Sequence, residues 1–246
     1  MAATQPTEPT GTSVSAGPSP ALDGLAAEAA TALRVEHWGE DGARSLTGFE
    51  ALHHSVGESS SRHWVDLTDP SPELTAAVAR ELGLHPLVAE DIEERNQRPK
   101  LELTGEHVHL VAFAIAYERE VVTEEIDFVL GRNFLLTVHT RFWDTWTAQH
   151  LREGAGPLLA HGPDFLMWAL LDALVDAYFP VFDRLEDQID DLEDRIVDDP
   201  GRGTREQLFK LNRTRVEIRH VMAPQREIFN QLETSARRIW RLRKDR

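Results

Sequence analysis

The segment Glu125–Thr140, with the sequence EIDFVLGRNFLLTVHT, decides the fold class of this 246-residue chain. Two runs rich in Val, Leu, Ile and Phe flank the turn Gly131-Arg132-Asn133, an arrangement typical of a hairpin with a three-residue loop. The run His107–Tyr117 precedes the hairpin and is also rich in Val, Ile and Phe, and His63–Thr68 reads as a further strand. We therefore expect a sheet that is at least partly antiparallel.

Short helices are expected between the first of these strands and the others. Ser71 is placed as an N-cap with Pro72 at the first helical position, so a helix should run to about Leu82 and stop at Gly83. A second helix should begin near Pro86. It should end before Pro99, because a residue that precedes proline disfavours the helical conformation.

A helix is expected around Trp143–Leu151. From Asp164 to about Asp198 the whole pattern is helical, with Pro180 as either a boundary or a kink. Pro200–Gly203 should break this helix. Thr204 and Gln207 then form a capping box for a last helix. That helix has a predicted kink at Pro224 and carries an apolar stripe, interrupted at Arg215 and Gln225, at Leu208, Leu211, Ile218, Met222, Phe229 and Leu232. The stripe predicts either packing against the preceding helix in a hairpin or a stalk shared between subunits.

These elements predict an α+β protein with a mixed, partly antiparallel sheet. We expect a disordered tail over residues 1–22, whose Thr, Ser, Pro and Gly cannot bury enough surface to order it. An α/β domain should follow over residues 23–160, then acidic helices over 161–199 and a long helix over 203–246.

Composition excludes several classes of protein. The chain has 42 acidic and 26 basic residues and a net charge of −16, which argues against a nucleic-acid partner. It has no cysteine, so disulfides, thiolate zinc sites and cysteine nucleophiles are excluded. Its longest apolar stretch without a formal charge is His107–Tyr117, well short of the roughly 20 residues of a membrane-spanning helix. We expect the chain by itself to be soluble in the cytoplasm.

Two acidic features are candidates for metal binding. In the 18-residue segment Phe182–Asp199, nine residues are acids, many of them four positions apart on the predicted helix. Such like-charge pairs destabilise a helix, so the segment is either a solvated face or one screened by Mg²⁺. Glu90 and Asp91 lie on the short helix after Pro86. Adjacent helical residues point about 100° apart, so this pair is a poor chelate within one subunit but can contribute to a shared site.

Histidines offer a weaker candidate. His107 and His109 share one face of a strand, as ligands of some hydrolytic metal sites do, but no acidic or histidine cluster of matching spacing lies near them in sequence. A sheet-surface pair is the favoured interpretation. No phosphate-binding glycine loop, nucleophile elbow or zincin motif is present, so we expect no enzymatic activity.

Three separated motifs resemble the cytosolic domain of the CorA magnesium and cobalt transporters. They are LHPLVAEDI with QRPK at Leu84–Ile92 and Gln97–Lys100, ALLDALVDAYF at Ala169–Phe179, and MAPQREIF at Met222–Phe229. The resemblance runs from about Trp64 to Leu232 in the order of the family. It implies an α/β/α cytosolic domain followed by acidic helices and a stalk helix that leads to membrane spans.

The resemblance also implies a function. It implies a homopentameric channel in the inner (plasma) membrane, with this domain at the cytoplasmic face. Cytosolic divalent ions, either Mg²⁺ or alternatively Co²⁺ or Zn²⁺, would bind between subunits and hold the pore closed. On this pattern Glu90 and Asp91 match one side of the regulatory site. The opposing acid of the family would fall near Ser235, where the nearest acid is Glu233.

The pore motif Gly-Met-Asn is absent from this sequence, whose methionines stand only at positions 1, 167 and 222. We therefore expect this chain to carry the sensing and gating funnel and to stop before the spans. Two alternatives remain open: a ZntB-type zinc transporter domain, and a free-standing soluble protein that binds divalent ions without transport. A metal-dependent hydrolase using His107 and His109 is the least favoured interpretation.

Overall fold

The computed structural model describes residues 20–56, 60–117, 120–143, 151, 154–198 and 201–244. Its strands are β1 Leu33–Gly39, β2 Gly42–Thr47, β3 Arg62–Thr68, β4 Lys100–Thr104, β5 His107–Tyr117, β6 Val121–Leu130 and β7 Phe134–His139. Its helices are α1 Pro20–Ala32, α2 Phe49–Val56, α3 Pro72–Glu81, α4 Pro86–Glu94, α5 Gly156–Leu159, α6 Pro163–Asp176, α7 Phe179–Asp198 and α8 Arg202–Lys244.

The seven strands form one mixed sheet in the order β2-β1-β3-β7-β6-β5-β4. Only the central pair, β3 and β7, is parallel, and the other neighbours are antiparallel. The predicted hairpin is confirmed as β6 and β7, with Leu130 opposite Leu135 across the turn. The strand β4 was not predicted, although its sequence KLELT alternates polar and apolar residues over five positions.

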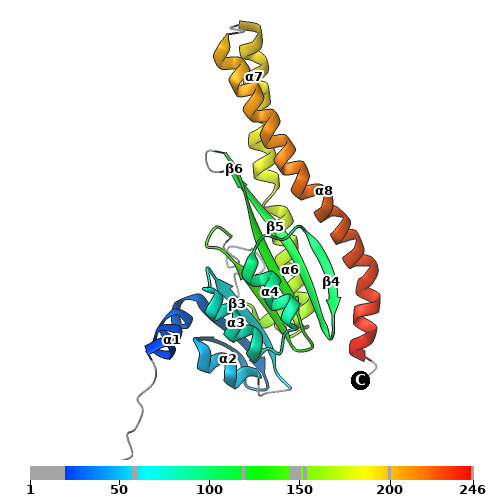
Figure 1. Ribbon diagram of the computed structural model, residues 1–246. Helices are drawn as coiled ribbons and strands as arrows, with labels where there is room; N and C mark the ends of the chain where they lie inside the picture. The colour runs from blue at the N-terminus through cyan, green and yellow to red at the C-terminus, as the bar shows by residue number, and fades with distance from the viewer. Residues whose placement is uncertain are drawn as a thin grey trace, which may run out of the picture.

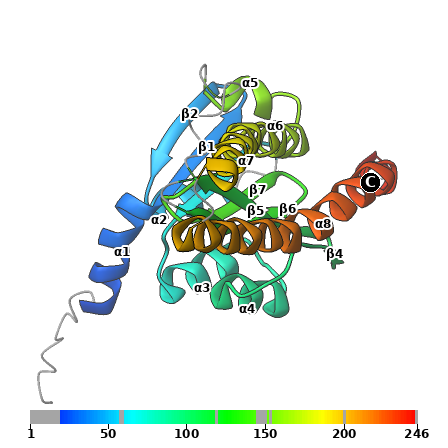
Figure 2. The same cartoon turned by 90° about the horizontal axis from the view of Figure 1, so that it is seen from above.

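Helices cover both faces of the sheet, which confirms the predicted α/β/α architecture. Figure 2 shows α3 and α4 on one side of the sheet and α5 and α6 on the other. Each side has its own apolar core. The α3–α4 side packs Leu74, Val78, Val88 and Ile92 on Val65, Val129 and Val138, and the opposite side packs Leu166, Leu170 and Leu174 on Leu110, Ile126 and Phe128.

The two short helices begin as predicted. Ser71 caps α3, and its Oγ accepts a hydrogen bond from the Leu74 N–H at 3.2 Å, while Gly83 follows the helix with a φ of 63°. His85 caps α4 in the same way, because its Nδ1 accepts from the Leu87 N–H at 3.2 Å. Arg95 closes α4 in the left-handed conformation, with a φ of 46°.

Two boundaries differ from the predictions. Residues 1–19 of the predicted tail lie outside the described residues, and α1 begins at Pro20, inside the 1–22 range. The helix predicted around Trp143–Leu151 also falls largely outside them. The last helix begins at Arg202, so Thr204 lies inside its first turn and the predicted capping box is wrong. Gln207 instead accepts a hydrogen bond from Arg195 of α7 at 3.1 Å.

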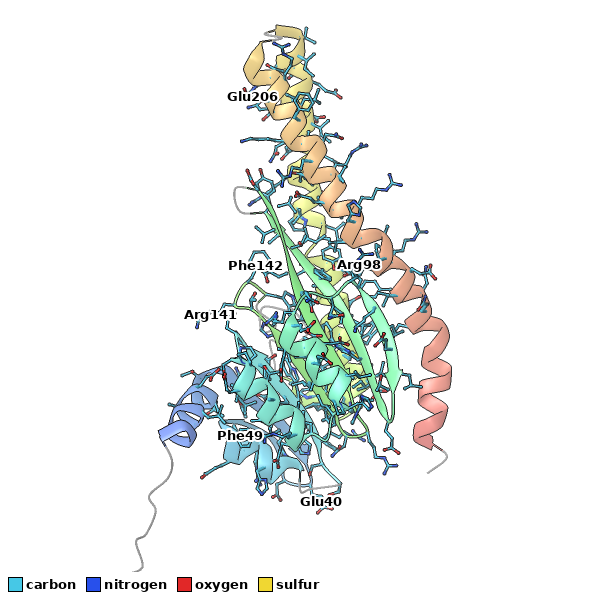
Figure 3. The ribbon with its side chains drawn as sticks, viewed as in Figure 1. Glu40, Phe49, Arg98, Arg141, Phe142 and Glu206 are labelled. Atoms are coloured by element: carbon cyan, nitrogen blue, oxygen red, sulfur yellow. The ribbon has the colours of Figure 1, made fainter. Side chains whose placement is uncertain are left out.

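The helices α7 and α8 form an arm that projects from the domain. Figure 1 shows α7 leading away from the sheet and α8 returning beside it and on past the β4 edge, and Figure 3 places Glu206 near the far tip. Pro180 stands at the start of α7 and is a boundary, whereas Pro224 lies inside the continuous helix α8. The helices α7 and α8 do form a hairpin, but Leu208 is 48% exposed, and Ile218, Met222 and Phe229 pack on the core against the sheet. The hairpin interpretation of the apolar stripe is thus confirmed only in part, and a stalk shared between subunits stays a prediction.

One stretch of this fold has the composition of a membrane span. Within Pro163–Val197, an 18-residue window is long and apolar enough to cross a membrane, judged by length and composition alone. Of that window, 44% is buried inside the protein. Leu166, Leu170 and Leu174 of that stretch belong to the core against the sheet. The apolar character of α6 therefore follows from its packing.

A buried amide joins α8 to the sheet. The pairing of β4 with β5 ends at Val111, so Phe113 presents its backbone N–H and C=O beyond the end of β4. Gln225 of α8 accepts from the Phe113 N–H at 2.7 Å, and Tyr178 donates its hydroxyl to the Phe113 C=O at 2.6 Å. The Gln225 amide also donates to the Tyr178 oxygen. We call these three residues the Gln225 lock.

We predict that Gln225→Leu lowers the free energy of unfolding by about 2–3 kcal/mol, because it leaves the partly buried Phe113 N–H without its partner and removes a donor to Tyr178. Urea denaturation measures this difference. Gln231→Leu, the same change at an exposed position on α8, is the matched control and should shift stability by no more than about 0.5 kcal/mol. Equal effects of the two substitutions would contradict the lock.

Candidate metal centre

The helix α4 places the predicted pair of acids in different surroundings. Val88 and Ile92 face the sheet and are buried, which orients the rest of the helix. Glu90 is exposed on the outer side. Asp91 lies on the flank that faces β4, with its side chain 25% exposed, and hydrogen-bonds to Lys100 Nζ. The two carboxylates therefore do not converge within one subunit, as the helical geometry predicts.

Beneath α4, the sheet carries a cluster of charged side chains on β4, β5 and β6. Glu102 stands directly opposite His109 in the β4–β5 register. Lys100 lies 3.6 Å from Glu102 through its Nζ, so its ammonium stands between Glu102 and Asp91. Carboxylate oxygens of Asp91 and Glu102 and a ring nitrogen of His109 all lie within 4.8 Å of one another. We call Asp91, Glu102 and His109 the α4 corner.

The sequence pattern favoured a position for His109 on the sheet surface, and the structure shows that this prediction is wrong. The His109 side chain is fully buried and its Nε2 lies 2.8 Å from Asp127 Oδ1. His107 is half-buried and packs its ring 5.6 Å from that of Phe134. The two histidines therefore have separate environments. The sequence did not reveal the neighbours of His109, because Asp91 and Asp127 each lie 18 residues away along the chain and come close to it only in the folded structure.

Glu125 extends this cluster along β6. Its Oε2 accepts from the Gln97 N–H at 2.9 Å, while Oε1 is buried and has no partner among the described residues. Burial first, and then the charge of Asp127, raise the pKa of Glu125 to about 7, although the hydrogen bond from Gln97 and the charge of Arg95 oppose the rise. This carboxyl is therefore partly protonated at neutral pH.

A second buried network lies between β3 and β7. Asp66 Oδ1 accepts from Thr137 and from His139 Nε2, the latter at 3.0 Å, and Trp64 Nε1 donates to Thr137 Oγ1 at 2.8 Å. Burial alone would lower the pKa of His139, but the hydrogen bond and charge of Asp66, with the Thr140 carbonyl, together raise it. Every named group has a partner, so the network fixes the central parallel strands.

The acids of the arm form a solvated surface. Among the described side chains of α7, the seven acids from Asp183 to Asp194 make no ion pair. A groove of about 490 Å³ between α7 and α8 brings Asp191 near Arg195, Lys210 and Glu217. The groove is lined by both acidic and basic groups, and no nucleophile is paired with a base among the described lining residues. Neither the exposed acids of α7 nor the described lining of the groove contains a set of catalytic residues.

Comparison with known proteins matches this architecture. The family model described as "CorA-like Mg2+ transporter protein" matches residues 59–246. The cobalt/magnesium transport protein CorA of Thermotoga maritima is 30% identical over 181 residues, which are 71% of this chain and 52% of that protein. The putative metal ion transporter YfjQ of Bacillus subtilis is 29% identical over 167 residues, 68% of this chain and 52% of that protein.

The complete structure of the CorA magnesium transporter from Methanocaldococcus jannaschii superimposes with a TM-score of 0.67 at 20% identity, covering 82% of this chain and 62% of that one. The fold is thus that of the soluble domain of CorA-type transporters. The chain belongs to the CorA-like Mg²⁺ transporter family. It spans about half the length of the curated relatives it matches.

The raised pKa of Glu125 predicts a pH dependence of stability. Between its ordinary value of 4.5 and about 7, the folded chain holds a proton that the unfolded chain has lost, so the free energy of unfolding should fall as pH rises through this window. Glu125→Gln cannot lose a proton and should remove about 1–2 kcal/mol of that fall. Denaturant unfolding of both proteins at pH 5 and pH 7.5 measures the difference.

The control is Glu124→Gln, the preceding residue, whose side chain points to the opposite face of β6. It should keep the pH dependence of the unsubstituted protein. If Glu125→Gln also keeps it, the carboxyl is already ionised over this range and the assigned burial effect is wrong.

Proposed function

We propose that this chain is the cytosolic metal-sensing and gating part of a divalent-cation transporter that moves Mg²⁺ or Co²⁺ across the plasma membrane. The observation that carries the proposal is the family match over residues 59–246. Relatives at 29–30% identity are named cobalt/magnesium and metal ion transporters, and the fold is shared with CorA. The proposed state of the whole protein is a homopentamer with this part at the cytoplasmic face.

Within this proposal, Glu90 and Asp91 supply one side of a regulatory Mg²⁺ site between neighbouring subunits. Glu90 is exposed on the outer side of α4, where a second subunit can approach it. Asp91 is partly exposed and held by Lys100. A divalent ion with oxygen ligands from two chains suits Mg²⁺, which retains waters and takes few carboxylates. The opposing position near Ser235 lies on α8, and its side chain is outside the described residues.

A zinc transporter of the ZntB type is the second candidate. The zinc transport protein ZntB of Yersinia pseudotuberculosis is 25% identical over 209 residues, 81% of this chain and 61% of that protein. Its similarity is lower than that of the CorA relatives, so Mg²⁺ and Co²⁺ are the favoured cargo. The third candidate is a free-standing soluble protein that binds divalent ions without transporting them. Two apolar segments of about 20 residues with Gly-Met-Asn, encoded downstream of Arg246, would favour transport over it.

We predict that millimolar Mg²⁺ raises the melting temperature and shifts the chain towards oligomers, because an ion bound only by the assembled state stabilises it by mass action. Glu90→Gln should weaken both effects. Glu93→Gln, also exposed on α4, is the matched control and should retain them. Light scattering measures the oligomer mass and thermal melts measure the melting temperature, each with and without Mg²⁺. Unchanged mass and melting temperature on adding Mg²⁺ would contradict the proposed interface site.

A further inference from the structure

The α4 corner brings three potential metal ligands together from three elements of one subunit. Asp91 comes from α4, Glu102 from β4 and His109 from β5, and their ligand atoms lie within 4.8 Å of one another. The β4–β5 register sets Glu102 beside His109. The burial of Val88 and Ile92 turns the Asp91 flank of α4 towards them. No second subunit is needed to bring these side chains together.

The buried histidine is the observation that points to a ligand. His109 is fully buried, and its Nδ1 has no hydrogen-bond partner among the described residues, whereas Nε2 is bonded to Asp127. A buried polar atom without a partner costs about 1–3 kcal/mol, so such atoms are rare in folded proteins. An imidazole that donates Nε2–H to a carboxylate keeps its lone pair at Nδ1. This is the arrangement found in histidines that bind metal ions.

We infer that the α4 corner binds one divalent transition-metal ion, of the Co²⁺ or Zn²⁺ class, through His109 Nδ1 and the carboxylates of Asp91 and Glu102. Asp127 orients the imidazole. One nitrogen and two carboxylate ligands suit Zn²⁺ and Co²⁺, whereas Mg²⁺ prefers an all-oxygen octahedron that retains several waters. Three protein ligands leave room for water or a fourth group. The site shares Asp91 with the proposed interface site, but it requires neither a second subunit nor the proposed transport function.

Lys100 makes this site responsive to competition between cations. Its ammonium hydrogen-bonds to Asp91 and lies 3.6 Å from Glu102. Its positive charge therefore lies between the two carboxylates, where a metal ion would bind. The carboxylates of Asp91, Glu102 and Asp127 outnumber this one ammonium, which leaves the corner formally negative around His109. The Lys100 side chain is 21% exposed. It can therefore turn to solvent when an ion binds.

The test is a titration of the full chain with Co²⁺, followed by visible absorption and calorimetry, with Zn²⁺ as competitor. One Co²⁺ should bind per chain independently of protein concentration, and Zn²⁺ should displace it. Glu102→Gln, at a side chain that is 52% exposed, should weaken Co²⁺ binding at least about tenfold. Asp127→Asn should weaken it about 10–100-fold. Lys100→Met should tighten it at least about threefold, because a competing cation is gone.

Two controls separate this site from the proposed interface site. Glu93→Gln on the exposed side of α4 and Glu90→Gln should leave Co²⁺ binding unchanged, while Glu90→Gln alone disturbs the Mg²⁺ response of the oligomer. If Asp127→Asn fails to fold, Glu102→Gln and Lys100→Met still decide the matter. Unchanged Co²⁺ affinity in Glu102→Gln, or equal loss in Glu90→Gln and Glu102→Gln, would overturn the inference.

Discussion

The Gln225 lock is the interaction on which the placement of the arm depends. The strand β5 is longer than its edge neighbour β4, so the backbone of Phe113 would be left open at a sheet edge. The Gln225 amide and the Tyr178 hydroxyl take the place of the absent strand. Burial raises the pKa of Tyr178, so its hydroxyl stays neutral and can donate. One cluster therefore fixes the sheet, the α6–α7 junction and α8 together.

The strand β4 connects this lock to the α4 corner. Lys100 and Glu102 lie on the face beneath α4, whereas Leu101 packs against the core that includes Ile218 and Ile228 of α8. A cation that draws Glu102 towards His109 thus acts on a strand whose other face supports α8. Shifts in packed elements pass through such contacts because close-packed interiors deform little. The geometry links a metal-binding corner to the helix that continues away from the domain.

The sequence predicted what depends on local pattern. The hairpin around Gly131, the cap at Ser71 and the helix start near Pro86 follow from turn and capping chemistry, and the structure confirms them. Pro180 was predicted as either a boundary or a kink, and the structure shows that it is a boundary. The contacts of His109 could not be predicted, because Asp91, Glu102 and Asp127 come from separate elements. The lock was also unforeseen. Gln225 reads as an interruption of an apolar stripe until Phe113 is seen to need a partner.

Hydrogen exchange at the Phe113 amide tests the central claim, that the Gln225 lock holds α8 against the sheet, most directly. The account predicts that this amide exchanges as slowly as amides of the central strands β3 and β7, since its opening requires α8 to leave the sheet. Exchange at the rate of an exposed edge amide, while β3 and β7 stay protected, would show that α8 is not fixed there and would contradict the account.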